Sequence, residues 1–185
     1  MVHMNDFEIR EAICEHMEKT HPEKFRIIDE LVIGEARADI VLVTDNLTGY
    51  EIKSDDDSYS RLPGQIKEYD KYFRQNYLVV GEGHRKTSVK HVPPYWGILC
   101  VSESKNGVQI ESIREAGQSP KFSQKRQLSL LWRKELNNIL KTNNLAKCTG
   151  KTKAYIRKYI LERVPKAVLQ KQICDEFFER DWTLL

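Results

Sequence analysis

Residues 37–53 read RADIVLVTDNLTGYEIK, and this stretch decides the fold. Residues 37–44 and residues 48–53 are rich in β-branched and aromatic side chains, which is typical of strands. Asp45-Asn46-Leu47 lies between them and carries a turn signal. The sequence therefore predicts an antiparallel hairpin at the centre of an α/β sheet.

The hairpin also predicts a polar patch. If Thr44 pairs with Thr48, Asp39 lies opposite Lys53, and Glu51 points to the same face because side chains alternate along a strand. Burying two carboxylates is costly unless a cation compensates them. Mg²⁺ binds through one or two carboxylates together with waters and phosphate oxygens. The patch is thus a candidate magnesium site, although an ExK triplet by itself is more often a solvated strand edge.

The flanking sequence predicts helices packed on a mixed sheet. A helix over residues 5–19 has Asn5 as its N-cap and Glu8 as capping-box partner. The other expected elements are strands over residues 25–33, 77–81 and 96–101 and a helix over residues 63–75 that begins at Pro63. The order is α-β-β-β-α-β with one more strand, which favours an α/β sheet with a helical crossover.

The C-terminal third differs in charge and in pattern. Residues 1–119 contain 15 Lys and Arg against 21 Asp and Glu, whereas residues 120–185 contain 15 against 6. Three helices are expected there, over residues 128–141, 151–164 and 167–180. We therefore predict two domains, a sheet-containing core over 1–119 and a basic helical region over 120–185. The helices fit either a helix-turn-helix-like module that binds phosphates or a cap packed on the core.

Composition excludes several classes of protein. No window approaches the roughly 20 apolar residues that cross a bilayer, and the N-terminus lacks a basic-then-apolar leader. We therefore expect a cytoplasmic protein without a membrane partner. The four cysteines are far apart in sequence, which argues for reduced thiols rather than a zinc site.

The residues of the patch resemble the PD-(D/E)XK nuclease superfamily. Ala38-Asp39 and Glu51-Ile52-Lys53 match its two motifs, with Ala38 in place of the proline. The following helix carries Gln65 and Tyr69, which look like the QxxxY motif of RecB-like nucleases in small bacterial and phage proteins. The resemblance covers about residues 5–101 and implies a restriction-endonuclease-like αβββαβ core followed by a C-terminal helical extension.

The resemblance implies a magnesium-dependent nuclease that hydrolyses phosphodiester bonds of DNA. Asp39, Glu51 and the Ile52 carbonyl would hold Mg²⁺, for which Mn²⁺ would substitute. Lys53 would position the attacking water, and Gln65 and Tyr69 would orient the substrate. The candidate catalytic residues are thus Asp39, Glu51, Lys53, Gln65 and Tyr69, with a core aromatic as the alternative role of Tyr69. Phage defence, recombination and repair are the roles that the resemblance permits. A nuclease acting on RNA and a non-catalytic nucleic-acid-binding protein with the same fold are the alternatives.

Further residues complete the predicted site. Glu30 on the first strand and Asp6 on the first helix are candidates for an additional metal ligand, or are surface and capping charges. Arg37 and Arg61 flank the patch and could bind phosphates or neutralise nearby aspartates. The other expected nucleic-acid-binding residues, in the basic region, are Lys151, Lys153, Arg157 and Lys158. DNA is the expected partner, and a homodimer is left open.

Overall fold

The chain divides into two compact units, which we describe separately. The structure is a computed structural model, and it describes residues 3–21, 24–105 and 107–184. The first unit is Met1–Phe122 and the second is Ser123–Leu185. The sequence placed a boundary a few residues earlier, after residue 119.

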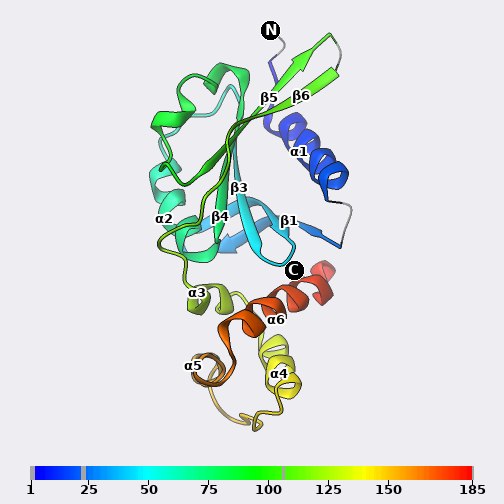
Figure 1. Cartoon of the computed structure of the whole chain (residues 1–185), viewed down its shortest axis with the longest axis vertical. Coiled ribbons are helices and arrows are strands. Elements are labelled where there is room, and N and C mark those ends of the chain that lie inside the picture. Colours follow the sequence, from blue (N-terminus) through cyan, green and yellow to red (C-terminus); the bar gives the residue numbers. More distant parts are fainter. Residues whose placement is uncertain (1–2, 22–23, 106, 185) are drawn as a thin grey trace. The chain divides into compact units, whose positions relative to one another are not determined.

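The first unit contains a six-stranded sheet and two main helices (Figure 1). Its elements are α1 (Asp6–Thr20), β1 (Arg26–Ile33), β2 (Ala36–Val43), β3 (Leu47–Lys53), α2 (Leu62–Tyr72), β4 (Gln75–Gly81), two 3₁₀ turns (Glu82–His84 and Ser88–Lys90), β5 (Gly97–Ser104) and β6 (Gly107–Arg114). The strands lie side by side in their sequence order, β1 to β6. Strands β3, β4 and β5 are parallel, and the other neighbouring pairs are antiparallel. The α/β class and the mixed sheet that the sequence predicted are therefore confirmed.

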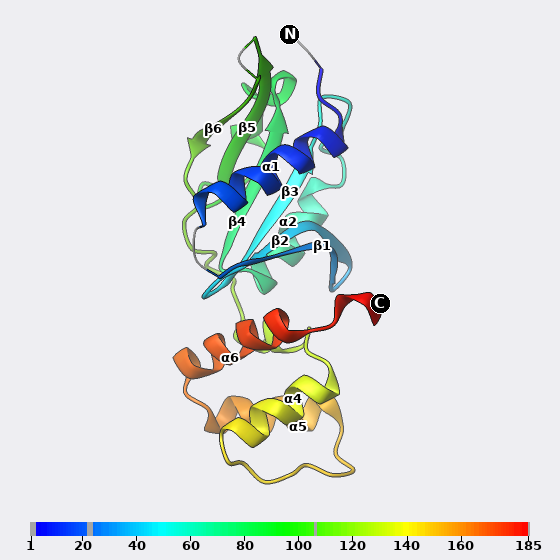
Figure 2. The ribbon, with the colours of Figure 1, turned by 90° about the vertical axis from the view of Figure 1, so that its right-hand side faces the viewer.

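Helix α1 covers one face of the sheet (Figure 2). Its residues Ile9, Ile13 and Met17 belong to one buried cluster with Ile52 on β3 and Val79 on β4. The predicted capping box is present, because Asn5 accepts from the backbone of Glu8 and the Glu8 carboxylate accepts from the backbone of Asn5. The apolar stripe thus orients the helix on the sheet, and the capping box defines where it begins.

Helix α2 packs on the opposite face, which is the face of the polar patch. Tyr69 on this helix and Phe73 directly after it are fully buried, with their rings 5.4 Å apart. They lie directly over Gly49 on β3, where an added Cβ would be within 3 Å of both rings. The glycine therefore lets this helix approach the strand that carries Glu51 and Lys53.

The register of the β2–β3 hairpin differs from the expected one by two residues. Val43 pairs with Leu47 and Val41 with Gly49, and Thr44 and Asn46 close the turn through a 2.9 Å backbone hydrogen bond. Leu47 is fully buried, so core packing draws it out of the predicted loop and into the strand. A shift of two residues keeps every side chain on its expected face, so Asp39, Glu51 and Lys53 still share one face of the sheet.

One other boundary in the first unit was wrong, and one strand was missed. Helix α2 ends at Tyr72, because Phe73 adopts an extended conformation and Gln75 already starts β4. Strand β6 was missed, since its sequence GVQIESIR is polar and largely exposed at the sheet edge. It lacks the apolar run by which a buried strand is recognised.

The second unit consists of helices α3 (Gln124–Leu128), α4 (Arg133–Thr142), α5 (Lys153–Arg163) and α6 (Lys166–Glu179), followed by a 3₁₀ turn (Trp182–Leu184). The single helix predicted over residues 128–141 is wrong, because α3 ends at Leu128 and a non-helical segment precedes α4. Trp132 adopts an extended conformation there and donates its backbone N–H to Glu135 at 2.6 Å. The same carboxylate binds Arg180 at 2.6 Å, so a tertiary ion pair stabilises a helix start that the local pattern hides.

Among the described residues, no helix has the length and apolar character needed to span a membrane.

Candidate functional site: a buried carboxylate–lysine centre

Strands β2 and β3 bring Asp39, Glu51 and Lys53 together on the α2 face. Glu51 is fully buried and Lys53 is 4% exposed. The Lys53 ammonium lies 2.5 Å from Oε1 of Glu51, and the Ile52 backbone N–H donates to Oδ2 of Asp39 at 2.8 Å. The centre therefore contains two carboxylates and one ammonium in a largely water-excluded position.

Tyr69 of α2 closes the inner side of this centre. Its hydroxyl donates to Oε2 of Glu51 at 2.7 Å and accepts from the backbone N–H of Asp39 at 3.1 Å. Burial, followed by the nearby Glu51 and Asp39 carboxylates, raises the pKa of Tyr69 well above its ordinary value. The residue predicted to face a substrate is thus fully buried and bonded to both strands.

The two carboxylates disfavour each other's charge. Burial and then the neighbouring Glu51 raise the pKa of Asp39 to about 7, although the Ile52 N–H and Lys53 act in the opposite direction. Within the described chain, Oδ1 of Asp39 has no hydrogen-bond partner, whereas both oxygens of Glu51 are bonded. Asp39 therefore offers an available oxygen at a position where added positive charge is favourable.

A pocket of about 650 Å³ opens over this centre. Asp39, Glu51 and Lys53 line it, as do Gln65 of α2 and several charged residues. Oε1 of Gln65 is buried and lacks a hydrogen-bond partner within the described residues. The lining also includes cations and anions at wider positions: Arg37, Arg61, Lys67, Asp6, Glu35 and Glu68. An unpaired acceptor in the same pocket as two carboxylates suits a bound cation or a ligand that donates.

The two additional acids that the sequence proposed are engaged by arginines. Glu30 lies 2.5 Å from Arg37 and 3.3 Å from Arg10, and Asp6 lies 3.5 Å from Arg10. In the part of the chain that the structure describes, no group of three or more His, Cys, Asp or Glu side chains could hold one metal ion. The structure therefore brings together Asp39, Glu51 and the Ile52 strand segment, and it pairs Glu30 and Asp6 with arginines, although Asp6 also lines the pocket.

Arg10 is a residue that the sequence did not single out. Its guanidinium donates to the backbone carbonyl of Asp39 at 2.6 Å and contacts Asp29 at 3.3 Å. The available signal was an arginine at the edge of the apolar face of α1, next to Met17 on the helical wheel. Arg10 fixes the β2 backbone at Asp39 from the opposite side of the sheet.

The aspartates of the loop after β3 have local roles. Asp57 accepts from the backbone and side chain of Ser54, and Asp55 accepts from the backbone N–H of Gly83 at 2.8 Å. Asp56 pairs with His3 at 3.3 Å. Asp57 therefore stabilises the chain directly after β3, and Asp55 joins this loop to the turn after β4. The expected neutralisation of these acids by Arg37 or Arg61 is not among the ion pairs of the described residues.

The expected nucleic-acid-binding residues of the second unit lie around α5. Lys151 precedes this helix, and Lys153, Arg157 and Lys158 are on it. Lys151, Lys153 and Lys158 are exposed and Arg157 is half-buried. They form a basic surface within the helical unit.

These features define a two-unit α/β protein with a buried carboxylate–lysine centre and a basic helical unit. The chain belongs to the family described as bacteriophage P4 protein cII, whose model matches residues 2–181. A curated relative, "Protein cII" of Enterobacteria phage P4, is 28% identical over 116 residues, which are 62% of this chain and 44% of the relative. The chain thus spans less than half the length of that relative. No solved structure matches the chain.

This family assignment corrects the functional interpretation of the motifs. The chain was expected to be a PD-(D/E)XK, RecB-like nuclease, and that membership is wrong because the family that matches nearly the whole chain is that of the phage P4 protein. The predicted magnesium-dependent hydrolysis of DNA, and the alternative hydrolysis of RNA, are withdrawn with it. Only the expected phage connection agrees with the family. The match of Asp39, Glu51 and Lys53 to the nuclease motifs is therefore not evidence of membership in that superfamily.

Proposed function

We propose that this protein binds nucleic acid in the cytoplasm, and that the Asp39–Glu51 centre holds a divalent cation that contributes to this binding. The observation that carries the proposal is the pairing of two carboxylates, Asp39 and Glu51, against a single buried ammonium, Lys53. When Asp39 is ionised, the centre has a surplus of negative charge, and Arg37 and Arg61 line the same pocket.

The residues fit a hard cation such as Mg²⁺, with Mn²⁺ as a substitute. Oδ1 of Asp39 and Oε1 of Gln65 are acceptors without protein partners among the described residues, and the Ile52 carbonyl is a further candidate ligand. Mg²⁺ needs only one or two carboxylates, because waters and phosphate oxygens complete its shell. When bound, the cation would supply positive charge for a phosphate. Arg37 and Arg61 would bind neighbouring phosphates.

The first unit then serves as a restriction-endonuclease-like core used for binding rather than hydrolysis. The α-β-β-β-α-β order supports this part of the proposal. DNA is the proposed partner because the basic second unit matches its charge. Self-association remains a prediction.

Calorimetry and anisotropy test the proposal together. Titration of Mg²⁺ into the protein should release or absorb measurable heat, and Glu51→Gln should abolish that signal. Glu111→Gln on β6 removes a carboxylate elsewhere and is the matched control. The wild type should bind a fluorescently labelled duplex more tightly in Mg²⁺ than in EDTA, whereas Glu51→Gln should bind it equally in both. The DNA should be recovered intact. Equal affinity in EDTA and Mg²⁺ would refute the cation's role.

A further inference from the structure

Four residues spaced four positions apart in the sequence form a ladder, with Lys151 just before α5 and Tyr155, Tyr159 and Arg163 on it. The rings of Tyr155 and Tyr159 lie 6.2 Å apart with an angle of 12° between their planes. Lys151 Nζ lies 5.3 Å from the centroid of the Tyr155 ring, and Arg163 Cζ lies 3.9 Å from that of Tyr159. We call this series of cation, ring, ring and cation the tyrosine ladder.

The ladder is not part of the core of the second unit. Ile156 and Ile160 are fully buried and provide the packing face of α5. Tyr155 is 46% exposed, and Lys151 and Arg163 are exposed. Tyr159 is half-buried. The exposed ring of Tyr155 and the accessible part of Tyr159 are therefore available to a ligand.

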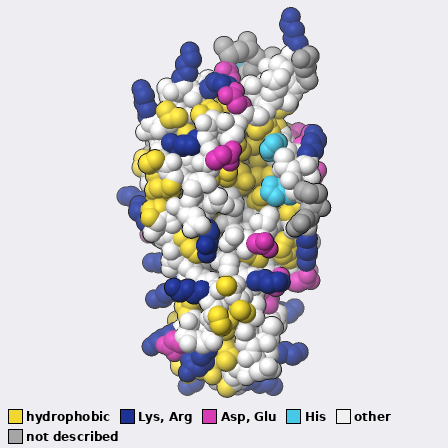
Figure 3. Space-filling model, in the orientation of Figure 1, with side chains coloured by type: hydrophobic (Ala, Val, Ile, Leu, Met, Phe, Trp, Pro, Cys, Tyr) yellow, Lys and Arg dark blue, Asp and Glu magenta, His cyan; other side chains and the backbone are white. Residues whose placement is uncertain are grey.

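The charge around the ladder selects a polyanion. Residues 147–163 contain six Lys and Arg but one acid, Glu162. Glu162 contacts Arg163 at 3.1 Å and Lys158 at 3.8 Å. The net charge of residues 147–163 therefore stays strongly positive. Figure 3 shows Lys and Arg side chains distributed over this helical part of the chain.

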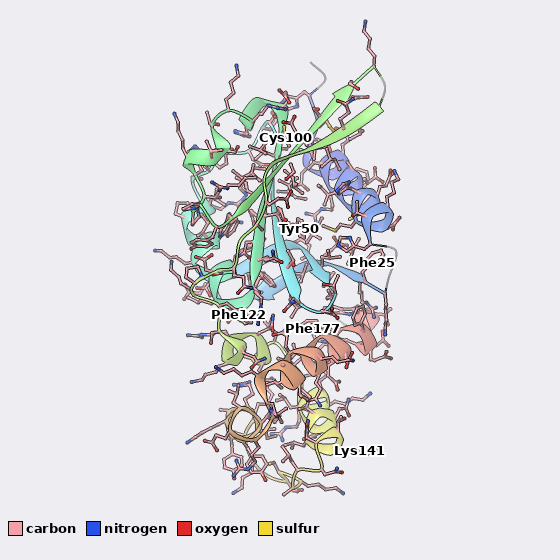
Figure 4. The ribbon with its side chains drawn as sticks, viewed as in Figure 1. Phe25, Tyr50, Cys100, Phe122, Lys141 and Phe177 are labelled. Atoms are coloured by element: carbon pink, nitrogen blue, oxygen red, sulfur yellow. The ribbon has the colours of Figure 1, made fainter. Side chains whose placement is uncertain are left out.

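A cavity of about 700 Å³ extends the basic surface beside the ladder. Arg133, Lys141 and Lys147 line it, and Lys141 is labelled near the end of α4 in Figure 4. Arg133 donates to the backbone carbonyl of Lys151 at 2.6 Å, so the cavity and the start of the ladder are joined. The phosphates of a nucleic acid that extends beyond the ladder would thus contact the cations that line this cavity.

We propose that the tyrosine ladder binds single-stranded nucleic acid, with unpaired bases stacked on Tyr155 and Tyr159 and phosphates bound by Lys151 and Arg163. Stacking of a base on an aromatic ring is stronger than an exposed cation–π contact, so a base displaces the two cations from the rings toward its phosphates. A duplex hides the faces of its bases and cannot stack in this way. The proposal shares only its ligand class with the function proposed above.

Anisotropy titrations of the full chain in EDTA test the ladder without the cation centre. The probes are a labelled single strand, an abasic strand of equal length and a duplex. The double variant Tyr155→Leu with Tyr159→Leu should bind the single strand about tenfold or more weakly. It should bind the abasic strand like the wild type, because that strand offers the same phosphates without bases.

Three controls separate stacking from folding and charge. The paired Tyr→Phe variants keep both rings and should bind like the wild type, and the Leu variants should retain the wild-type Tm. Lys151→Gln with Arg163→Gln should reduce the salt dependence on both strands, whereas Lys19→Gln on α1 should not. A preference for the duplex, or an equal loss on the abasic strand, would overturn the proposal. Since these titrations contain no divalent cation, they fail or succeed independently of Asp39 and Glu51.

Discussion

The hydroxyl of Tyr69 donates a 2.7 Å hydrogen bond to Oε2 of Glu51, joining α2 to β3 between two fully buried residues. The same hydroxyl accepts the backbone N–H of Asp39, so it connects the helix to both strands of the hairpin. The carboxylate centre is therefore part of the packing between the helix and the sheet, and changes to it should alter stability as well as binding.

Tyr69→Phe should lower the free energy of unfolding by about 1–3 kcal/mol, because it leaves a buried carboxylate oxygen without its donor. Urea denaturation measures the effect, and Tyr155→Phe on the surface of α5 is the matched control. Position 69 was predicted to face a substrate, and in that case the same variant would spare stability. An unchanged midpoint for Tyr69→Phe would contradict the hydrogen-bond network described for the centre.

Lys53→Met should destabilise the first unit by roughly 3–5 kcal/mol, since removing one partner of a buried ion pair leaves Glu51 uncompensated. The double variant Lys53→Met with Glu51→Gln should recover part of this loss, because Glu51 then no longer leaves a buried carboxylate without its ammonium partner. Thermal and urea melts compare the single and double variants. A double variant no more stable than Lys53→Met would show that the two side chains do not interact as an ion pair.

Asp39 should make the stability of the protein depend on pH. Its pKa rises from 3.8 in the unfolded chain to about 7 in the folded one, so between these values the native state keeps a proton that the unfolded chain has lost. Its contribution to stability is therefore greatest below about pH 4, decreases as the pH rises to about 7, and is constant above that.

Asp39→Asn isolates this effect. In EDTA the variant should exceed the wild type in unfolding free energy by on the order of 2 kcal/mol at pH 8, and by less at pH 5. Melts at a series of pH values provide the comparison, with Asp45→Asn in the hairpin turn as control. A difference that does not change between pH 4 and pH 8 would mean that Asp39 titrates normally.

The sequence predicted the patch because strand alternation alone brings Asp39, Glu51 and Lys53 to one face. It could not predict that Leu47 would join β3, because turn propensity and burial conflict at that position and burial depends on the tertiary structure. The predicted patch was still correct, since a register change of two residues leaves every side chain on the same face of the sheet.

The contact of Arg10 with Asp39 and the absence of support for hydrolysis could not be predicted from local sequence patterns. Arg10 contacts Asp39 across 29 positions of the chain, and no local period reports such a contact. The enzymatic interpretation failed for a related reason. A DxnExK pattern identifies charged residues on one face of a hairpin, whereas hydrolysis requires a full site that three short motifs do not specify.

Arg180 gives the last prediction, which concerns the second unit. Its guanidinium forms two 2.6 Å hydrogen bonds with Glu135 and lies 4.5–4.8 Å from the ring centroids of Trp132, Phe177 and Trp182. The pair is almost fully buried, so Arg180→Ala should cost about 3–5 kcal/mol by leaving Glu135 unpaired and uncovering aromatic surface. Since Glu135 also caps α4, hydrogen exchange should show loss of protection at the start of that helix. Arg163→Ala, which removes an exposed arginine stacked on one ring, should leave stability nearly unchanged. Equal effects of the two variants would exclude the buried pair as the feature that stabilises this unit.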